Sequence, residues 1–254
     1  MRRITLILLL LSLSLPPASM QAQQKTGRSP KRSGRNSTPT TTQRQAYQLG
    51  TRSVFIPPPA GFADAFSQSD DIAKLLIATE VPTNEVLTAH LPVEELNKLK
   101  RGERPNLDYY TKVSVLKLAK THDVSEAYFA GLVKQIEATT PQLLDINGPS
   151  MKSAVQTLRG GLSSVSGEEV QVDLEQPQNL GSFEKTKNVY SFMLLLTLNG
   201  PKGKLPVLGG ISFVRVNQRV IFVYTYRKFT SEKDAEVLRD FSREWVRQIL
   251  AANT

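Results

Sequence analysis

The sequence predicts an α+β protein with a mostly antiparallel central sheet and helices packed on both faces. Two features of the last third of the chain carry this prediction. Strands are expected at 189–198, 211–216 and 219–227, and Asn217 and Gln218 join the last two at the spacing of a tight hairpin. A helix with an apolar stripe then closes the chain.

The register of this hairpin follows from its short turn. Pairing Val216 with Arg219 places Phe213 opposite Phe222 on one face, and the other face is apolar as well. A strand that is apolar on both faces belongs in the middle of a covered sheet. We therefore expect helices on both sides of it.

The final helix supplies one of these layers. Ser231 and Asp234 resemble a capping box at its start. Its apolar stripe consists of Leu238, Phe241, Trp245 and Ile249. Trp245 is the only tryptophan of the chain, and its place in the stripe predicts a core anchor rather than a stacking platform for a ligand.

Earlier elements alternate between the two types of secondary structure. Strands are expected at 52–56, 85–91 and within 108–120, and a short helix is expected to begin at 91–96 and to end at Arg101 and Gly102. Residues 71–78 fit either a helix or a strand. Ser125 is the predicted N-cap of a helix that ends at Ala138, and a further helix is expected at 150–162.

The N-terminus has the three parts of a secretory signal peptide. Arg2 and Arg3 precede a mainly apolar stretch of 12 residues, after which Pro16 and Pro17 lead to small residues. The stretch is too short to span a membrane stably. We assign residues 1–22 as a signal peptide cleaved after Ala22, and expect an exported protein of the bacterial periplasm or a secreted one, with no transmembrane segment in the mature chain.

A basic tail follows at residues 23–50, where we predict a disordered linker. Its cations are Lys25, Arg28, Lys31, Arg32, Arg35 and Arg44. They could contact an anionic envelope surface, or form a solvated spacer, which we favour. The segment offers only Tyr47 for base stacking, which argues against a nucleic-acid partner.

A single domain is predicted at 51–254. From Ala46 onward the chain has 24 Lys and Arg against 23 Asp and Glu, so most of the net charge of +9 lies before it. The chain has no cysteine, which excludes disulfides and thiolate chemistry. We expect neither a metal site nor a cofactor.

Catalytic signals are weak. His122 and Asp123 could form part of a triad, but the chain has no Gly-x-Ser-x-Gly motif, and His90 is expected to have a structural role. Ser114 and Lys117 match Ser-x-x-Lys, yet on a strand they point to opposite faces. Paired carboxylates at 70–71, 94–95 and 168–169 leave a carboxylate-dependent hydrolase open.

Four cations lie near the two ends of the predicted hairpin. They are Arg215, Arg219, Arg227 and Lys228. Such a set could bind an anion or an acidic partner, and the alternative is a solvated rim.

The layout also resembles a known family. The run from Phe55 to Phe62, the hairpin within 207–229 and the helix with Trp245 resemble the PsbP-like family, and 84–110 resembles uncharacterised exported bacterial proteins. The resemblance implies a central antiparallel sheet between helices, and noncatalytic accessory or assembly factors that act through protein contacts.

The resulting functional expectation is a noncatalytic exported accessory or binding domain with an unidentified protein partner. Two alternatives remain. One is a hydrolase of the cell envelope that uses carboxylates or His122, and the other is an envelope-associated protein held by its basic tail.

Overall fold

The computed structural model describes residues 45–200 and 203–254, so the signal peptide and the cations of the predicted tail lie outside the described residues. The strands are β1 (Ala46–Leu49), β2 (Arg52–Phe55), β3 (Phe62–Asp64), β4 (Asn84–Pro92), β5 (Tyr109–Leu116), β6 (Asp173–Leu174), β7 (Gln178–Lys185), β8 (Val189–Gly200), β9 (Gly203–Val216) and β10 (Arg219–Lys228). The helices are α1 (Asp70–Thr79), α2 (Val93–Lys100), α3 (Glu126–Leu143), α4 (Pro149–Ser166) and α5 (Glu232–Ala251).

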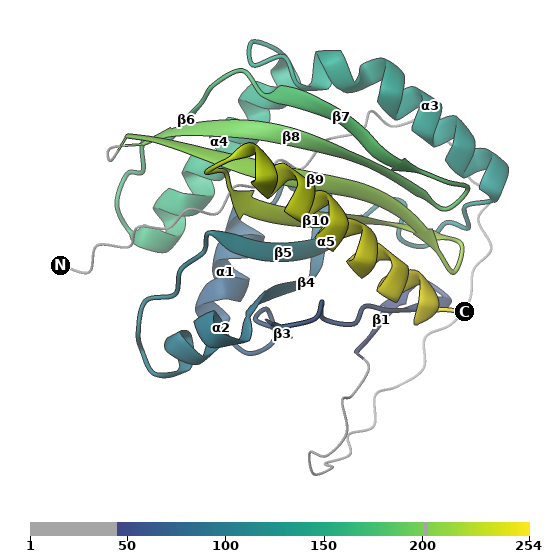
Figure 1. The fold of residues 1–254 in the computed structure, drawn as a ribbon, viewed down its shortest axis with the longest axis horizontal. Helices are drawn as coiled ribbons and strands as arrows, with labels where there is room; N and C mark the ends of the chain where they lie inside the picture. The colour runs from purple at the N-terminus through teal and green to yellow at the C-terminus, as the bar shows by residue number, and fades with distance from the viewer. Residues whose placement is uncertain (1–44, 201–202) are drawn as a thin grey trace.

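One antiparallel sheet of eight strands organises the domain (Figure 1). Its order is β3-β4-β5-β10-β9-β8-β6, and β7 also pairs with β8. Strands β1 and β2 form a separate antiparallel pair. The predicted α+β class, with a mostly antiparallel sheet, is confirmed.

The hairpin of β9 and β10 has the predicted register. Val216 pairs with Arg219, and Phe213 pairs with Phe222. Asn217 and Gln218 have φ angles of 47° and 61°, which is the backbone of the type I′ turn that matches strand twist.

Helix α5 covers one face of the sheet. Ser231 and Asp234 form the predicted capping box, and Trp245 is 1% exposed. The indole N–H of Trp245 donates to the carbonyl oxygen of Pro57 at 2.8 Å. The β1–β2 pair packs on the same face, because Leu49 and Val54 join the cluster around Trp245.

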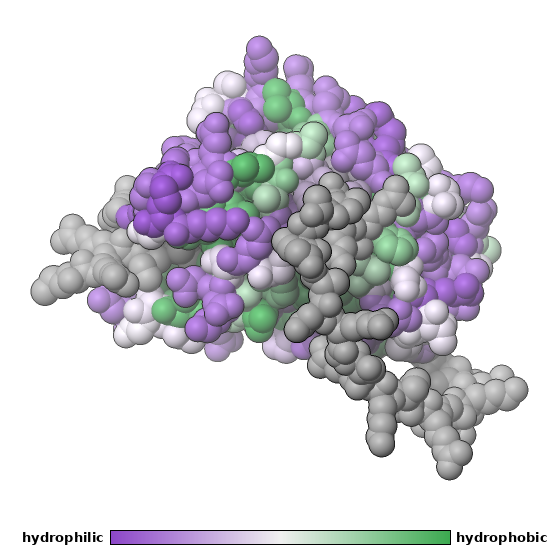
Figure 2. All heavy atoms as spheres, turned by 90° about the horizontal axis from the view of Figure 1, so that it is seen from below, coloured by the Kyte–Doolittle hydropathy of each residue, from purple (hydrophilic) through white to green (hydrophobic). Residues whose placement is uncertain are grey.

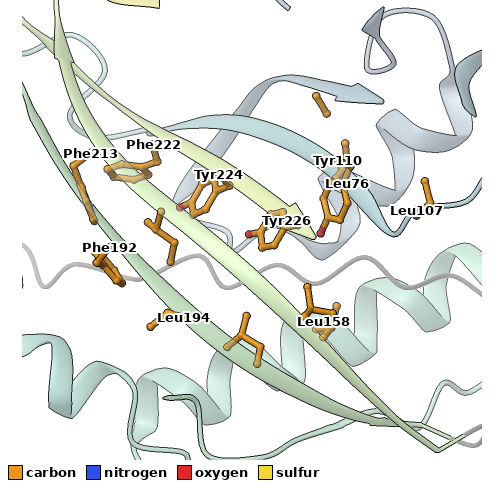
Figure 3. Packing of buried hydrophobic residues seen from close by; sticks show 14 of the residues in the cluster. Leu76, Leu107, Tyr110, Leu158, Phe192, Leu194, Phe213, Phe222, Tyr224 and Tyr226 are labelled. Carbon is orange, nitrogen blue, oxygen red and sulfur yellow. The ribbon is translucent and has the colours of Figure 1, made fainter. Parts of the chain in front are cut away.

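Helices α1, α3 and α4 cover the other face. Their apolar residues join those of β8, β9 and β10 in the largest core cluster, part of which Figure 3 shows. Gly161 of α4 makes a close approach to α1 possible, because a Cβ there would lie 2.2 Å from the carbonyl oxygen of Ala78.

Some elements differ from the expectation. Residues 46–49, expected in the tail, form β1, because they pair with β2 and Leu49 is buried in the cluster around Trp245. Residues 71–78 belong to helix α1, and α3 continues past Ala138 to Leu143 with Pro141 in its last turn. Strands β3, β6 and β7 were not predicted, since the first two are very short and the third is mostly exposed.

Hydrophilic residues dominate the described surface in Figure 2, and apolar residues appear between them in separate areas. Among residues 45–200 and 203–254, no helix is long and apolar enough to cross a membrane.

Candidate functional site

The structure does not arrange His122 and Asp123 as a catalytic pair. The Asp123 carboxylate forms ion pairs with Arg219 and, at 3.5 Å, with Arg52. The hydrogen bond from Arg219 holds the pKa of Asp123 below its usual range. Nδ1 of His122 is shielded from water and has no hydrogen-bond partner within the described part of the chain. Asp123 is therefore an ion-pair partner of Arg52 and Arg219 and does not orient the His122 imidazole.

His90 has the structural setting that was predicted for it. It is 1% exposed, with Nδ1 3.1 Å from the hydroxyl of Thr111 and Nε2 3.3 Å from that of Thr88. Its ring meets Trp245 edge-on at 5.4 Å between centroids. Burial lowers the pKa of His90 to about 4, so its imidazole stays neutral near pH 7.

The four cations of the hairpin make contacts within the domain at two separate places. Arg215 donates from Nε to the carbonyl oxygen of Val124 at 2.7 Å, and the buried Arg219 donates to that of Leu49 at 2.9 Å. These contacts attach the loop before α3 and strand β1 to the turn end of the hairpin.

The other two cations lie at the far end of β10. Arg227 pairs with Asp234 at 2.8 Å, and Lys228 lies 3.8 Å from the Asp108 carboxylate. Arg219 and Arg227 are eight residues apart on one strand, which corresponds to roughly 26 Å. The four candidate anion-binding residues are therefore not brought together.

A buried polar centre escaped the sequence prediction. Lys112 of β5 is fully buried and pairs with Glu80, the C-cap of α1, at 2.5 Å. The same carboxylate accepts from Asn84 at 3.0 Å, and the Lys112 ammonium lies 4.6 Å from the ring centre of Tyr224. Burial lowers the pKa of Lys112. This centre ties the end of α1 to the sheet.

A shallow depression opens beside the neighbouring tyrosines. Tyr110 and Tyr226, which stack at 4.7 Å, line it together with Leu107, Asp108, Leu205, Val207 and Lys228. It encloses about 250 Å³, part of it open to solvent, which is below the usual size of a small-molecule site.

A partly exposed apolar area runs between β7 and α5. We call it the β7–α5 strip, and it comprises Leu180, Phe183, Glu184, Leu195 and Arg243, all of which are half-buried. Leu180, Phe183 and Leu195 pack against the small cluster beneath α5. Arg243 lies 5.6 Å from the ring centre of Phe183 and donates to its carbonyl oxygen at 2.8 Å.

Irregular pairing shapes this strip. Ser182 pairs with Phe192 and Glu184 with Ser191, so β7 has an extra residue at this point. The bulge turns Phe183 and its neighbour Glu184 to the same face of the sheet. Nothing in the alternation of the sequence marks this change.

One carboxylate oxygen of Glu184 in the strip has no hydrogen-bond donor among the described residues. Its Oε2 atom is shielded from water and accepts no hydrogen bond from residues 45–200 or 203–254. Burial raises the pKa of Glu184, against the nearby charges of Arg243 and Arg247.

Strand β7 also lies at an edge of the sheet. It pairs with β8 on one side, and among the described strands none pairs with its other side. An ion pair of 2.6 Å between Lys185 and Glu137 attaches its end to α3. The strip and the open edge together form the candidate contact site.

Comparisons with known proteins place the chain in no family. No family model matches the chain, and no curated protein matches it either. Among solved structures, the chain is similar to the Ran-binding protein Mog1p of Saccharomyces cerevisiae, with 10% identity and a TM-score of 0.30 over 83% of this chain and 94% of that one. A mutant of Mog1 gives the same identity and TM-score over 82% and 94%.

These comparisons correct the family prediction. The resemblance to the PsbP-like family is wrong, because no family model supports it and the two solved structures named above are Mog1 proteins instead.

Proposed function

We propose that this chain is a noncatalytic exported binding domain that acts through protein contacts, and that the β7–α5 strip is its contact site. The carrying observation is the partly buried apolar set Leu180, Phe183 and Leu195 beside an open strand edge. Apolar side chains that a fold leaves grouped at its surface are typical of protein interfaces.

The contacts of the other candidate polar residues support the choice of the β7–α5 strip as the contact site. His90, Arg215, Arg219 and Arg227 are engaged in contacts inside the domain. The strip, in contrast, presents an apolar surface, an unsatisfied carboxylate oxygen and strand backbone in one place.

A binding comparison tests the site. The tagged mature chain is incubated with envelope and soluble fractions of the source cell, and retained proteins are quantified by mass spectrometry. Leu180→Asp places a charge in the strip. Leu118→Asp is its matched control, because Leu118 is 74% exposed and lies between β5 and α3, outside the strip. We expect a partner that the Leu180 variant loses and the Leu118 variant keeps. Equal retention by both variants would refute the site.

Export has its own test. Fractionation of the source cell, followed by mass determination of the mature N-terminus, should find the protein outside the cytoplasm and cleaved near Ala22. An intact Met1 in a cytoplasmic fraction would contradict export.

Attachment through the basic tail is the second candidate, and the acid-free run of six cations from Lys25 to Arg44 favours it. Deletion of 23–44 should abolish binding to anionic vesicles at low salt, and added salt should weaken binding of the intact chain. Binding that survives the deletion would eliminate this candidate.

A further inference from the structure

We infer that the partner enters the candidate site as an extended segment that pairs antiparallel with the open edge of β7 and places a basic side chain against Glu184. This inference rests on the proposed function and specifies the chemistry of the partner. It follows from three properties of the site: its backbone, its irregular pairing and its charge.

The backbone of β7 selects an extended occupant. On its outer side the strand has main-chain groups to which no described strand pairs. At the bend two main-chain groups of β7 are already bound by side chains, because the Gly181 N–H donates to Asn179 and the Phe183 carbonyl oxygen accepts from Arg243. A segment that adds to a sheet edge satisfies unpaired main-chain groups, while its alternate side chains lie on the two faces of the sheet. On the α5 face these side chains would cover Leu180 and Phe183.

The irregular pairing restricts which segments fit. The register shifts between Asn179 and Ser182 and again between Ser182 and Glu184, and Gly181 has a φ of 88°. Bulges of this kind discourage unselective pairing of sheet edges. The occupant therefore has to follow a bent edge, and most regular strands are rejected.

Charge specifies one side chain of the occupant. The Oε2 atom of Glu184 has no donor among the described residues. The cations of α5 near it have other contacts, since Arg243 binds Asp240 at 3.2 Å and Arg247 binds Glu244 at 2.7 Å. A Lys or Arg of the occupant would supply the missing donor and neutralise the carboxylate.

Cross-linking can determine the direction of the bound segment relative to β7. The chain has no native cysteine, so Gln178→Cys, Leu180→Cys and Glu184→Cys each provide a unique point for a photo-activated cross-linker. The exposed Lys74 of α1, changed to cysteine, is the control position. Products formed in cell fractions are mapped by mass spectrometry.

Antiparallel pairing predicts an ordered result. The three positions should attach to one short segment, and the attached residue number should fall as the β7 position rises from 178 to 184. Attachment to scattered or rising positions would overturn the extended antiparallel occupant while leaving a protein contact intact. Products no more abundant than at the control position would instead remove the proposed function.

The mapped segment, made as a peptide, then tests the charge. We expect Glu184→Gln to weaken its binding about tenfold and Glu184→Lys to weaken it more, in keeping with the loss of a charge-assisted hydrogen bond. Restored affinity between Glu184→Lys and a peptide whose basic residue is changed to Glu would support the pairing. Unchanged affinity of Glu184→Lys would overturn it.

Discussion

The two faces of the sheet are covered to different extents. Helices α1, α3 and α4 close one face over the large core cluster and bury even the Lys112–Glu80 ion pair. On the other face α5 lies with the β1–β2 pair over a second core cluster, and Leu180, Phe183 and Leu195 remain only partly buried beside it. Both faces contribute to stability, but the α5 face also leaves surface available for a partner.

Breaking the Lys112–Glu80 ion pair should give the largest loss of stability on the closed face. Lys112→Met should cost about 3–5 kcal/mol of unfolding free energy, because it leaves the Glu80 carboxylate buried without its cation. Denaturant unfolding measures the loss. The double change Lys112→Met with Glu80→Gln should recover much of it, and a double variant as unstable as the single one would show that the pair is not the cause.

Trp245 gives the equivalent test on the α5 face. Trp245→Ala should also cost about 3–5 kcal/mol, since it removes a fully buried side chain and its hydrogen bond to Pro57. Val237→Ala on the same helix is the control, because Val237 is 40% exposed, and it should change stability by no more than about 0.5 kcal/mol. Equal melting temperatures for the two variants would mean that the buried side of α5 is misassigned.

Substitutions at the adjacent glycines Gly160 and Gly161 of α4 distinguish the effect of packing from the effect of helix propensity on stability. Gly161→Ala should cost about 1–3 kcal/mol, because its Cβ would meet the backbone of Ala78. Gly160→Ala, with no neighbouring atom within 4 Å of its Cβ, should stabilise the helix by about 0.5–1 kcal/mol. Thermal melts that shift in opposite directions are expected, and a stabilising Gly161→Ala would contradict the close α1–α4 contact.

The elements that the sequence predicted are those governed by local rules. The Asn217–Gln218 turn determines the β9–β10 register, and the capping box at Ser231 determines where α5 begins. The burial of Lys112 had no such local signal, because a lysine within an alternating strand normally indicates an exposed face.

The candidate site depends on contacts that local rules do not describe. Leu180 and Phe183 are three residues apart, so their shared face arises only from the bulges of β7. The partners of Arg215 and Arg219 lie about 90 to 170 positions away in the sequence. Long-range pairing of this kind has no periodic signature in the chain.

Lowering the pH should reduce the stability contributed by the start of α5, by less than the core substitutions above. Hydrogen bonds from Thr230, Arg227 and Ser231 hold the pKa of Asp234 well below its ordinary value. The folded chain therefore binds this proton less readily than the unfolded chain, so the contribution of Asp234 is complete above about pH 4 and is lost as the pH falls below that value. Asp234→Asn should cost about 1 kcal/mol at pH 7 and less at pH 2.5. Denaturant unfolding at both pH values measures the difference, with Asp240→Asn on the exposed side of α5 as the control. A pH-independent cost would show that the charge of Asp234 does not stabilise the helix start, and that α5 is held on its face by packing alone.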